Sequence, residues 1–526
     1  MEFSAESSLI LVGLLTAGAA LLALAELVRI PYPILLVLGG LTVGFVPGMP
    51  DIELSPDLVL VAILPPLLYG SAFFTSLREL RANIRPIGLL AVGLVLTTML
   101  AVAVVAHALI PGLDWSTAFV LGAIVSPTDP TAATSIAQRL GLPRRLIALI
   151  EGESLVNDGT ALVAYRVAVV AVVSGSFSLV GASGRFVFNV AGGIAVGLAV
   201  GYLIRQVRRR LDNPPVEITI SILSGYFAYL PAQAAGVSGI LAAVTVGIYM
   251  GWHTPELTSP QTRLQGFAVW EIIFFVLNAL LFGLVGLQLP AIIDSLSGIS
   301  TGTLIRYAVI ITVVVMAARF AWVFAAASAS RLLPGGRGAP SPWRSSTVLA
   351  WSGMRGAVSL AAALALPLTT DAEAPFPDRD LLVFLTFSVI LGTLVVQGLT
   401  LPALIRALNL EDDGLAEKED AKARIHAADA ALERLEELLE EEWVREDTAE
   451  RLRGLYSFRR ERFMSRFDVE GDGGIEDRSA DYQRLRHELL EAERRAVIAL
   501  QRSGRIDDGV ARRVVRDLDL EDARLE

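Results

Sequence analysis

A succession of apolar runs, extending from the first residues to about Asn409, is the feature that most constrains this chain. Most of the runs approach or exceed the roughly 20 residues that a helix needs to cross a bilayer. Hydrophobic residues make up 53% of the sequence, and a soluble chain would bury them in compact domains instead of long uninterrupted runs. The pattern therefore predicts an all-α membrane protein.

About thirteen spans account for the apolar runs, and the short ones are expected to be tilted or only half-buried. They cover residues 8–28, 33–48, 57–73, 86–110, 115–138, 145–174, 186–205, 217–233, 237–252, 264–289, 303–331, 346–367 and 380–407. Glu2 and Glu6 replace the basic region of a signal peptide, so the first run is expected to be a retained span. The sequence then becomes dense in Glu, Asp and Arg, which predicts a transmembrane domain over 1–409 and a charged helical tail over 410–526.

The distribution of cations predicts the orientation of the spans, because short cytoplasmic loops collect Lys and Arg. With the amino terminus outside, every odd-numbered span ends at a cytoplasmic loop. Those loops hold Arg29, Arg78, Arg81, Arg85, Arg139, Arg144, Arg145, Arg205, Arg208, Arg209, Arg210, Arg331, Arg337 and Arg344. The opposite loops are poor in cations, apart from Arg185 and Arg379. The pattern predicts a multi-pass protein of the cell (plasma) membrane with a cytoplasmic tail.

Two of the spans are interrupted near their middle. The fifth carries Ser-Pro-Thr-Asp-Pro at 126–130, and the twelfth carries Ser-Gly-Met-Arg-Gly at 352–356. Prolines and glycines at bilayer depth release backbone groups, which only surrounding protein or water can satisfy. If spans one to six and spans eight to thirteen are inverted repeats, the two interruptions correspond, and their half-helix ends face a central ion site.

Ionisable residues inside the spans are costly to bury and therefore informative. They are Asp129 in the fifth span, Glu153 and Asp158 in the sixth, Arg319 in the eleventh and Arg355 in the twelfth. The structural alternative is that these residues only hold helices together. For Glu153 and Arg319, whose opposite charges would satisfy each other, that alternative and a functional role are equally open. Asp158 has no obvious partner in the sequence, which favours a functional role.

The helix that contains Glu153 and Asp158 brings several oxygen atoms together. Residues three and four apart share a helix face, so Ser154, Asn157 and Asp158 can face one cavity. A carboxylate, a hydroxyl and an amide oxygen suit Na+, because hard cations prefer oxygen ligands. Burial disfavours a charged carboxyl group, so Asp158 is expected to hold a proton until a cation displaces it. Such competition is sufficient for antiport if the empty site cannot cross, and moving the bare anion would cost several kcal/mol.

Three residues of the first interruption are expected to support this site. Pro130 cannot donate a hydrogen bond to the carbonyl one turn earlier, which frees backbone oxygen atoms for an ion. Thr128 offers a hydroxyl or a carbonyl oxygen. Asp129 can bind the ion or neutralise helix amino-terminal dipoles at the crossing, and the second role is favoured.

With these residues in place, the chain resembles the monovalent cation:proton antiporter family, in its bacterial NhaP and animal NHE branch. The first matching stretch is Ser-Pro-Thr-Asp-Pro at 126–130, followed by Leu-Gly-Leu-Pro-Arg at 140–144 and Glu-Gly-Glu-Ser-Leu-Val-Asn-Asp at 151–158. The second is Trp-Ser-Gly-Met-Arg-Gly-Ala-Val-Ser-Leu at 351–360, which runs into Leu-Pro at 366–367. The motifs are long, ordered and correctly spaced, and the resemblance covers essentially the whole membrane part.

The resemblance implies a mobile core domain, a dimerisation domain, elevator-like alternation and a homodimer. It implies that Asp158 is the main carboxylate for the ion and the proton, with Thr128, Asp129 and Ser154 around it. A bound Na+ would then lie at Asp158, Ser154 and Thr128.

The resemblance also assigns three supporting residues. The buried ion pair of the family maps onto Glu153 and Arg319, and its arginine in the second unwound helix maps onto Arg355. Relatives with two consecutive Asp residues are typically electrogenic, so Asn157 before Asp158 suggests one-for-one, electroneutral exchange.

One position departs from the family pattern. Many members carry an acidic residue after a Pro-Pro-Leu-Leu-aromatic run in the third span, whereas here that run, at 65–69, is followed by Gly70. Any water-mediated help from that carboxylate is therefore missing, which leaves the ion preference open.

The tail is expected to form a small helical domain that regulates transport or only folds beside it. Its expected helices cover 427–443, 446–466 and 481–501, with a last one from Asp507. The segment Asp468–Ser479 resembles a calcium loop, but Ser479 stands where such a loop needs a bidentate Glu. We therefore interpret this segment as a loop between helices and expect no calcium there.

Other functions fit the sequence less well. K+/H+ exchange is the alternative within the same class, because the sequence does not specify coordination distances. A cation channel would need symmetric filter repeats, and a membrane receptor with a sensor tail would not need carboxylates beside broken helices. There is no phosphate-binding Gly-x-x-x-x-Gly-Lys-Ser/Thr motif, no cysteine and no cluster of nucleophile and base, so a pump, a thiolate metal site and an enzyme are disfavoured and no cofactor is expected. The net charge of −10 argues against a nucleic-acid partner.

Overall fold

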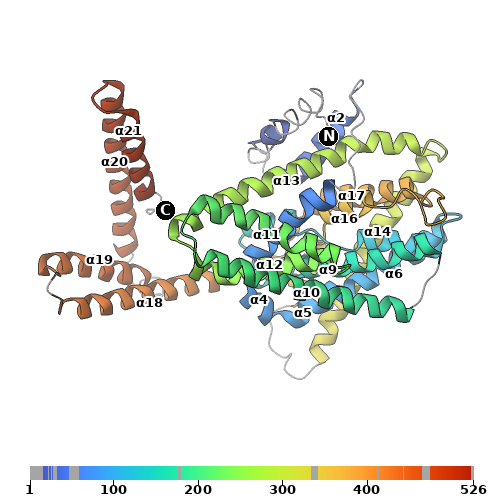
Figure 1. Cartoon of the computed structure of the whole chain (residues 1–526), viewed down its shortest axis with the longest axis horizontal. Helices are drawn as coiled ribbons and strands as arrows, with labels where there is room; N and C mark the ends of the chain where they lie inside the picture. The colour runs from blue at the N-terminus through green and yellow to red at the C-terminus, as the bar shows by residue number, and fades with distance from the viewer. Residues whose placement is uncertain are drawn as a thin grey trace. The chain divides into compact units, whose positions relative to one another are not determined.

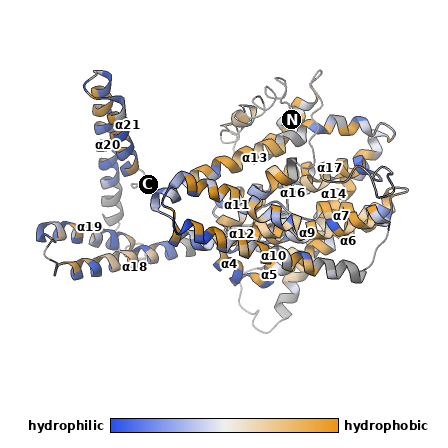
Figure 2. Ribbon diagram, viewed as in Figure 1, coloured by the Kyte–Doolittle hydropathy of each residue, from blue (hydrophilic) through white to orange (hydrophobic). Residues whose placement is uncertain are grey.

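The computed structural model describes residues 32–46, 58–175, 179–332, 342–410, 414–441, 443–464 and 474–522, with scattered positions between 13 and 27. It divides into two compact units, Met1–Glu411 and Asp412–Glu526. Both are built from helices (Figure 1). The first is mainly hydrophobic and the second is rich in hydrophilic residues (Figure 2).

The helices of the first unit follow the apolar runs of the sequence. They are α2 (Tyr32–Gly44), α3 (Leu64–Phe74), α4 (Leu77–Ala82), α5 (Ile84–Gly88), α6 (Val95–Leu109), α7 (Trp115–Val125), α8 (Thr131–Arg139), α9 (Arg144–Ser174), α10 (Leu179–Arg208), α11 (Pro214–Ala234), α12 (Gly239–Leu257), α13 (Pro260–Ser295), α14 (Thr301–Leu332), α15 (Pro342–Trp351), α16 (Ala357–Leu364) and α17 (Arg379–Ala407). The π-helical segments η1 (Leu58–Ile63) and η2 (Leu89–Leu94) precede α3 and α6.

Six helical stretches in the described part of the chain are long and apolar enough to cross a membrane. They are Ile84–Leu109, Arg144–Ser174, Val187–Arg208, Pro260–Ser295, Thr301–Ser328 and Arg379–Ala407. Most of the first expected span, 8–28, lies outside the described residues, so the count of thirteen stays a prediction.

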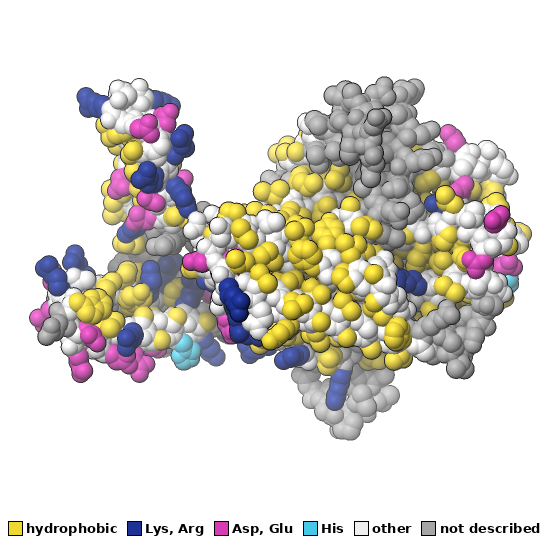
Figure 3. All heavy atoms as spheres, viewed as in Figure 1, with side chains coloured by type: hydrophobic (Ala, Val, Ile, Leu, Met, Phe, Trp, Pro, Cys, Tyr) yellow, Lys and Arg dark blue, Asp and Glu magenta, His cyan; other side chains and the backbone are white. Residues whose placement is uncertain are grey.

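The exterior of the first unit is apolar. The face visible in Figure 3 is dominated by hydrophobic side chains. Large apolar residues such as Leu100, Phe188, Leu203 and Val309 are exposed on its helices. Monomeric soluble proteins rarely expose contiguous apolar patches larger than a few hundred Å², so this surface matches a hydrocarbon environment.

The interior of the first unit contains two hydrophobic clusters. The smaller one lies among α3, α10, α11, α12 and α13 and includes Tyr69, Met250 and Trp270. The larger one is built mainly from α2, α6–α9 and α13–α17. The charged residues that the sequence analysis singled out lie among the helices of the larger cluster, near the place where α7 and α8 meet α15 and α16.

Both expected interruptions are confirmed. The fifth span is divided between α7, which ends at Val125, and α8, which begins at Thr131. The twelfth is divided between α15, which ends at Trp351, and α16, which begins at Ala357. Proline restricts the residue before it and cannot donate a backbone hydrogen bond, so the two prolines at 127 and 130 prevent a continuous helix.

The second unit contains α18 (Leu415–Leu438), α19 (Glu446–Met464), α20 (Gly474–Arg502) and α21 (Asp508–Asp522). The expected start of the first tail helix at Ala427 is wrong, because α18 begins twelve residues earlier. That stretch lacks an apolar stripe, but residues such as Ala, Glu, Lys and Arg have high helix propensity. An ion pair one turn apart, Asp420–Arg424, adds to its stability. The first half of the calcium-like segment Asp468–Ser479 lies outside the described residues. Its second half is helical, because α20 begins at Gly474, so the expected loop is wrong there and the expected helix start at 481 is seven residues too late.

Candidate functional site

The two interruptions cross and are hydrogen-bonded to each other. The backbone N–H of Asp129 donates to the carbonyl oxygen of Met354, at 2.8 Å. The side chain of Arg355 reaches back the other way, and its Nε donates to the carbonyl oxygen of Val125, at 3.0 Å. Thr393 of α17 accepts a hydrogen bond from the backbone N–H of Arg355, at 3.1 Å. These hydrogen bonds therefore hold the two interruptions to each other, to the end of α7 and to α17.

Asp129 lies between the amino termini of two half-helices. Its Oδ1 accepts from the N–H of Thr131 in α8, at 2.9 Å, and its Oδ2 accepts from the N–H of Ala357 in α16, at 3.2 Å. A carboxylate is stabilising at a helix amino terminus because it compensates the positive end of the dipole. A Cβ at Gly356 would overlap this carboxylate, so the contact needs glycine there. These hydrogen bonds match the dipole-neutralising role that the sequence favoured for Asp129.

Two arginines lie at the opposite, carboxyl-terminal ends of the half-helices. Arg355 contacts the carbonyl of Val125 at the end of α7 and also donates to Gly353. Arg319 of α14 donates through Nε and Nη2 to the carbonyl oxygen of Leu349 in α15, at 3.2 and 2.9 Å. Cations are stabilising at helix carboxyl termini. Each half-helix end at the crossing therefore meets a charge of the sign that suits it.

Glu153 and Arg319 form the buried ion pair that the sequence suggested. The Arg319 guanidinium donates to both carboxylate oxygens of Glu153, through Nη1 to Oε1 and through Nη2 to Oε2 at 2.9 Å. Both side chains are at most 1% exposed. The pair joins α9 to α14, and the Leu349 contact joins both to α15.

Thr128 connects the first interruption to α9. Its Oγ1 donates to Glu153 Oε1, at 3.2 Å, and accepts from Asn157 Nδ2, at 2.8 Å. The hydroxyl of Ser154 donates to the carbonyl oxygen of Thr128. Because Ser154 gives its only proton to that carbonyl, the lone pairs of its own oxygen stay available to another ligand.

Asp158 is the one member of this group without a partner in the described part of the chain. It is only 8% exposed, and no hydrogen-bond donor or cation from the described residues contacts its carboxylate. One helical position earlier, Asn157 Oδ1 is buried and also receives no hydrogen bond from those residues. Buried polar groups are nearly always satisfied, so these two neighbouring groups can accept a proton or a cation.

The structure thus brings most of the candidate residues into contact. Thr128, Ser154, Asn157 and Glu153 form one network, while Asp129 and Arg355 stabilise the crossing of the half-helices. Pro130 precedes the first residue of α8 and makes no site contact of its own beyond the helix start. Sequence reasoning missed Thr393 and the carbonyl groups of Val125 and Leu349, because hydroxyl groups and backbone atoms in apolar helices give no distinctive pattern.

The departure at Gly70 has a packing explanation. A Cβ there would lie 2.8 Å from Trp270 Cζ3 and against the ring of Phe274. The two aromatic rings of α13 therefore fill the space that a side chain at this position would need, so α3 and α13 pack closely without a carboxylate between them.

Comparison with known proteins identifies the family of the chain. The family model described as "Sodium/hydrogen exchanger, transmembrane" matches residues 11–407. An uncharacterised Na+/H+ exchanger of Mycobacterium tuberculosis is 38% identical over 524 residues, which cover 98% of this chain and 96% of the relative. A sodium, potassium, lithium and rubidium/H+ antiporter of Bacillus subtilis is 38% identical over 387 residues, or 71% of this chain and 58% of the relative.

Among solved structures, the sodium proton antiporter MjNhaP1 from Methanocaldococcus jannaschii shares the fold, with a TM-score of 0.62. The match covers 76% of this chain and 97% of that one, at 19% sequence identity. Because the family model spans most of the chain and the mycobacterial relative aligns along nearly all of it, the protein belongs to the sodium/hydrogen exchanger family of multi-pass membrane antiporters.

Proposed function

We propose that this cation/proton antiporter exchanges Na+ for H+ one for one, with the two ions competing for the carboxylate of Asp158. The observation that carries the proposal is the buried, unpartnered carboxylate of Asp158 beside the unpartnered Asn157 Oδ1. A proton or a cation bound there would remove the cost of a bare anion in a medium of low dielectric constant.

The oxygen atoms around Asp158 suit a hard cation. Ser154 lies four residues earlier on the same helix face, and its hydroxyl is held in place by the Thr128 carbonyl. Asn157 is oriented by its hydrogen bond to Thr128, which leaves its amide oxygen free. Carboxylate, amide and hydroxyl oxygens are the ligands that Na+ and similar ions prefer. We therefore assign Asp158, Asn157 and Ser154 as candidate ion ligands, with Thr128 as a ligand or as the residue that orients them.

The charges around the crossing favour one-for-one exchange. The carboxylates of Asp129 and Glu153 are balanced by the guanidinium groups of Arg319 and Arg355, which contact the same half-helices. Asp158 is then the one uncompensated charge of the group, and its carboxylate is also within electrostatic range of Asp129. One proton or one Na+ makes the whole site neutral, whereas the empty site carries a net negative charge and is costly to move across the membrane.

Alternating access requires these helices to move as one body. Hydrogen bonds and the buried ion pair join α7, α9, α14, α15, α16 and α17 around the crossing. We propose that this group moves against α2, α3 and α10–α13, in the elevator-like manner that the resemblance implied. The homodimer, the outward-facing amino terminus and the cytoplasmic tail of 410–526 are further parts of this proposal.

K+ is a second candidate for the exchanged cation. The Bacillus subtilis relative is named for potassium, lithium and rubidium beside sodium. K+/H+ exchange at the same carboxylate is therefore the alternative, and it would use the same residues.

The test is exchange in vesicles that contain the purified protein and a pH-sensitive dye. After a pH gradient is imposed, Na+, K+ or Li+ is added, and dissipation of the gradient is recorded for the wild type and for Asp158→Asn. We expect Na+ to dissipate the gradient in the wild type and no cation to do so in Asp158→Asn. Asp212→Asn, which changes an exposed aspartate in a loop, is the matched control and should retain exchange.

Three outcomes would contradict the proposal. Exchange that survives Asp158→Asn would move the site elsewhere, and a response to K+ alone would replace Na+ by K+. Rates that change when a membrane potential is imposed would show net charge movement and refute one-for-one exchange.

A further inference from the structure

A second polar site lies away from the crossing, among the helices that surround the smaller hydrophobic cluster. A cavity of about 220 Å³ opens where the end of α3 meets α10, α11, α12 and α13. Its polar lining includes Arg208, Glu217, Thr262 and Arg263. None of these residues contacts the ion site described above, so the antiport mechanism does not account for them.

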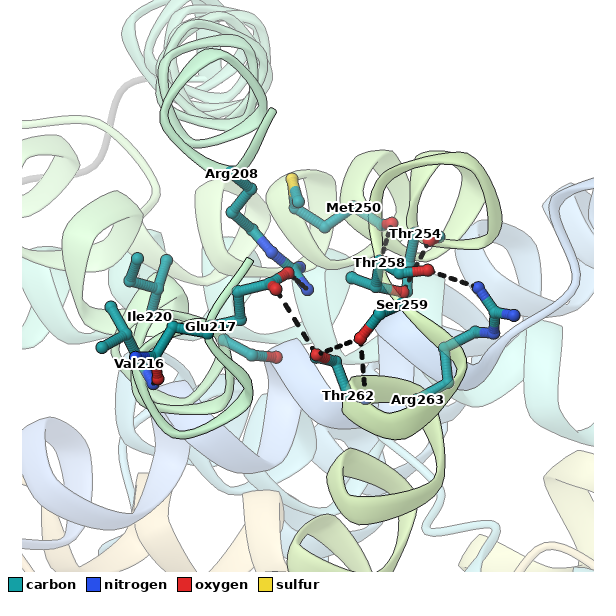
Figure 4. A network of polar contacts seen from close by, with 12 residues as sticks. Arg208, Val216, Glu217, Ile220, Met250, Thr254, Thr258, Ser259, Thr262 and Arg263 are labelled. Atoms are coloured by element: carbon teal, nitrogen blue, oxygen red, sulfur yellow. Dashed lines mark hydrogen bonds and ion pairs between the residues drawn. The ribbon is translucent and has the colours of Figure 1, made fainter. Parts of the chain in front are cut away.

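Arg208 is buried but poorly satisfied. It is 3% exposed, and Figure 4 shows it facing Glu217, to which Nη2 donates across 3.4 Å. In the described part of the chain its Nε and Nη1 have no hydrogen-bond partner. Glu217 accepts one further hydrogen bond, from Thr262, also at 3.4 Å. Because Arg208 makes only this one long contact, most N–H donors of its guanidinium group have no acceptor. The donors of a buried charged group are normally paired.

The unused donors select an anion with several oxygen atoms. The guanidinium group presents its N–H donors in a planar fork that matches a phosphate or carboxylate. Arg263 also lines the cavity, where it donates to the carbonyl oxygens of Thr258 and Pro255 at 2.5 and 3.3 Å. With Glu217 counted, the two arginines give the cavity a net charge of about +1. The site therefore has room for one further negative group.

The remaining walls are apolar and reach the outer surface. Phe73, Phe74, Ile218, Phe267 and Trp270 line the cavity beside the arginines. Phe74 is 40% exposed and Phe267 is 59% exposed, so this wall is continuous with the hydrophobic exterior of the unit. A small water-soluble anion would leave these walls without a partner, whereas an amphipathic anion would cover them.

We propose that this cavity binds the phosphate headgroup of an anionic membrane lipid, with the acyl chains against Phe74 and Phe267. Basic pockets between membrane-spanning helices on the cytoplasmic side bind such headgroups. The cavity lies at the carboxyl end of α10, where Arg205, Arg208, Arg209 and Arg210 gather. The distribution of cations assigns this end to the cytoplasm.

The test uses the full-length protein, purified in detergent and stripped of native lipid. Its melting temperature is measured while phosphatidylglycerol, phosphatidylcholine or sn-glycerol 3-phosphate is added. We expect a saturable rise with phosphatidylglycerol and little change with the zwitterionic lipid. An equal rise with sn-glycerol 3-phosphate would identify a water-soluble phosphate as the ligand and overturn the lipid proposal. No rise with either phosphate-bearing anion would overturn it entirely.

Variants distinguish lipid binding in the cavity from attraction of the lipid by exposed surface cations. Arg208→Gln/Glu217→Gln removes both charges together and so avoids an unpaired buried carboxylate. It should weaken phosphatidylglycerol binding about tenfold or more, which corresponds to about 1.4 kcal/mol. Arg209→Gln, an exposed cation one residue away, is the matched control and should keep the wild-type affinity. An equal loss in Arg209→Gln would refute the site.

A steric variant serves if the charge variant does not fold. A Cβ at Gly266 would approach only Ile218, at 3.9 Å, so a larger side chain can enter the cavity without displacing backbone. Gly266→Leu should abolish the stabilisation by phosphatidylglycerol while Na+/H+ exchange persists. Stabilisation of wild-type size in this variant would place the lipid elsewhere.

Discussion

Removing one partner of the Glu153–Arg319 pair should strongly destabilise the first unit. Arg319→Met keeps much of the side-chain volume but deletes two hydrogen bonds to Glu153 and two to the Leu349 carbonyl. Because both charged side chains are at most 1% exposed, solvent does not screen the loss. An uncompensated buried charge costs about 3–5 kcal/mol, and the uncapped end of α15 adds about 1 kcal/mol.

The assay is the apparent melting temperature of the protein in detergent micelles, where a loss of this size lowers the midpoint by several degrees. Glu153→Gln/Arg319→Met should be more stable than Arg319→Met, since no bare carboxylate remains in the double variant. Arg306→Met changes an exposed arginine of the same helix and should leave the melting temperature unchanged. If Arg319→Met melts like the wild type, or if Glu153→Gln/Arg319→Met is no more stable than Arg319→Met, the coupling argued from the structure is refuted.

Three further predictions concern the crossing and the tail. Asp129→Asn removes the negative charge shared by two helix amino termini and should cost about 1–2 kcal/mol, measured as a lower melting temperature; an unchanged value would contradict the capping role. Gly356→Ala should abolish both stability and exchange because its Cβ overlaps the Asp129 carboxylate, while Gly88→Ala, whose Cβ meets nothing within 4 Å, should retain both. In the tail, the hydrogen bond and charge of Asp522 raise the pKa of His487 above its usual 6.5. A raised pKa means that the pair stabilises the fold fully below the ordinary imidazole range and loses this contribution as the pH rises through the raised value. Hydrogen exchange of α21 in the full chain, corrected for its intrinsic rate, should therefore quicken as the pH rises, and His487→Gln should lack this dependence; the same dependence in both proteins would exclude the pair as its cause.

Local sequence was sufficient for the helical character of the apolar runs, for the two interruptions and for the choice of candidate ion-site residues. Apolar runs predict helices because the hydrocarbon core leaves a backbone few other ways to satisfy its hydrogen bonds. Pro127 and Pro130 interrupt the fifth span because proline lacks a backbone N–H and restricts the residue before it, which requires no contact with other helices. Asp158 stands out because a carboxylate inside an apolar run is expensive wherever the helix packs.

Two other features were not inferred, one although its cause is local and one because its cause lies in distant parts of the chain. The early start of α18 reflects helix propensity and the Asp420–Arg424 pair, which an apolar stripe does not report. The Arg208 cavity depends on the ends of five helices converging, and its arginine looked in the sequence like one more cation of a cytoplasmic loop.

The sequence by itself determined where the chain crosses an apolar phase, where two helices break and which carboxylates lie at that depth, because these follow from local composition and backbone chemistry. Only the tertiary structure decided which charge meets which helix end. Asp129 reaches the amino terminus of α16, and Arg319 reaches both Glu153 and the carbonyl end of α15. Such contacts join residues separated by 30 to 228 positions, and helix packing alone brings them within hydrogen-bonding distance.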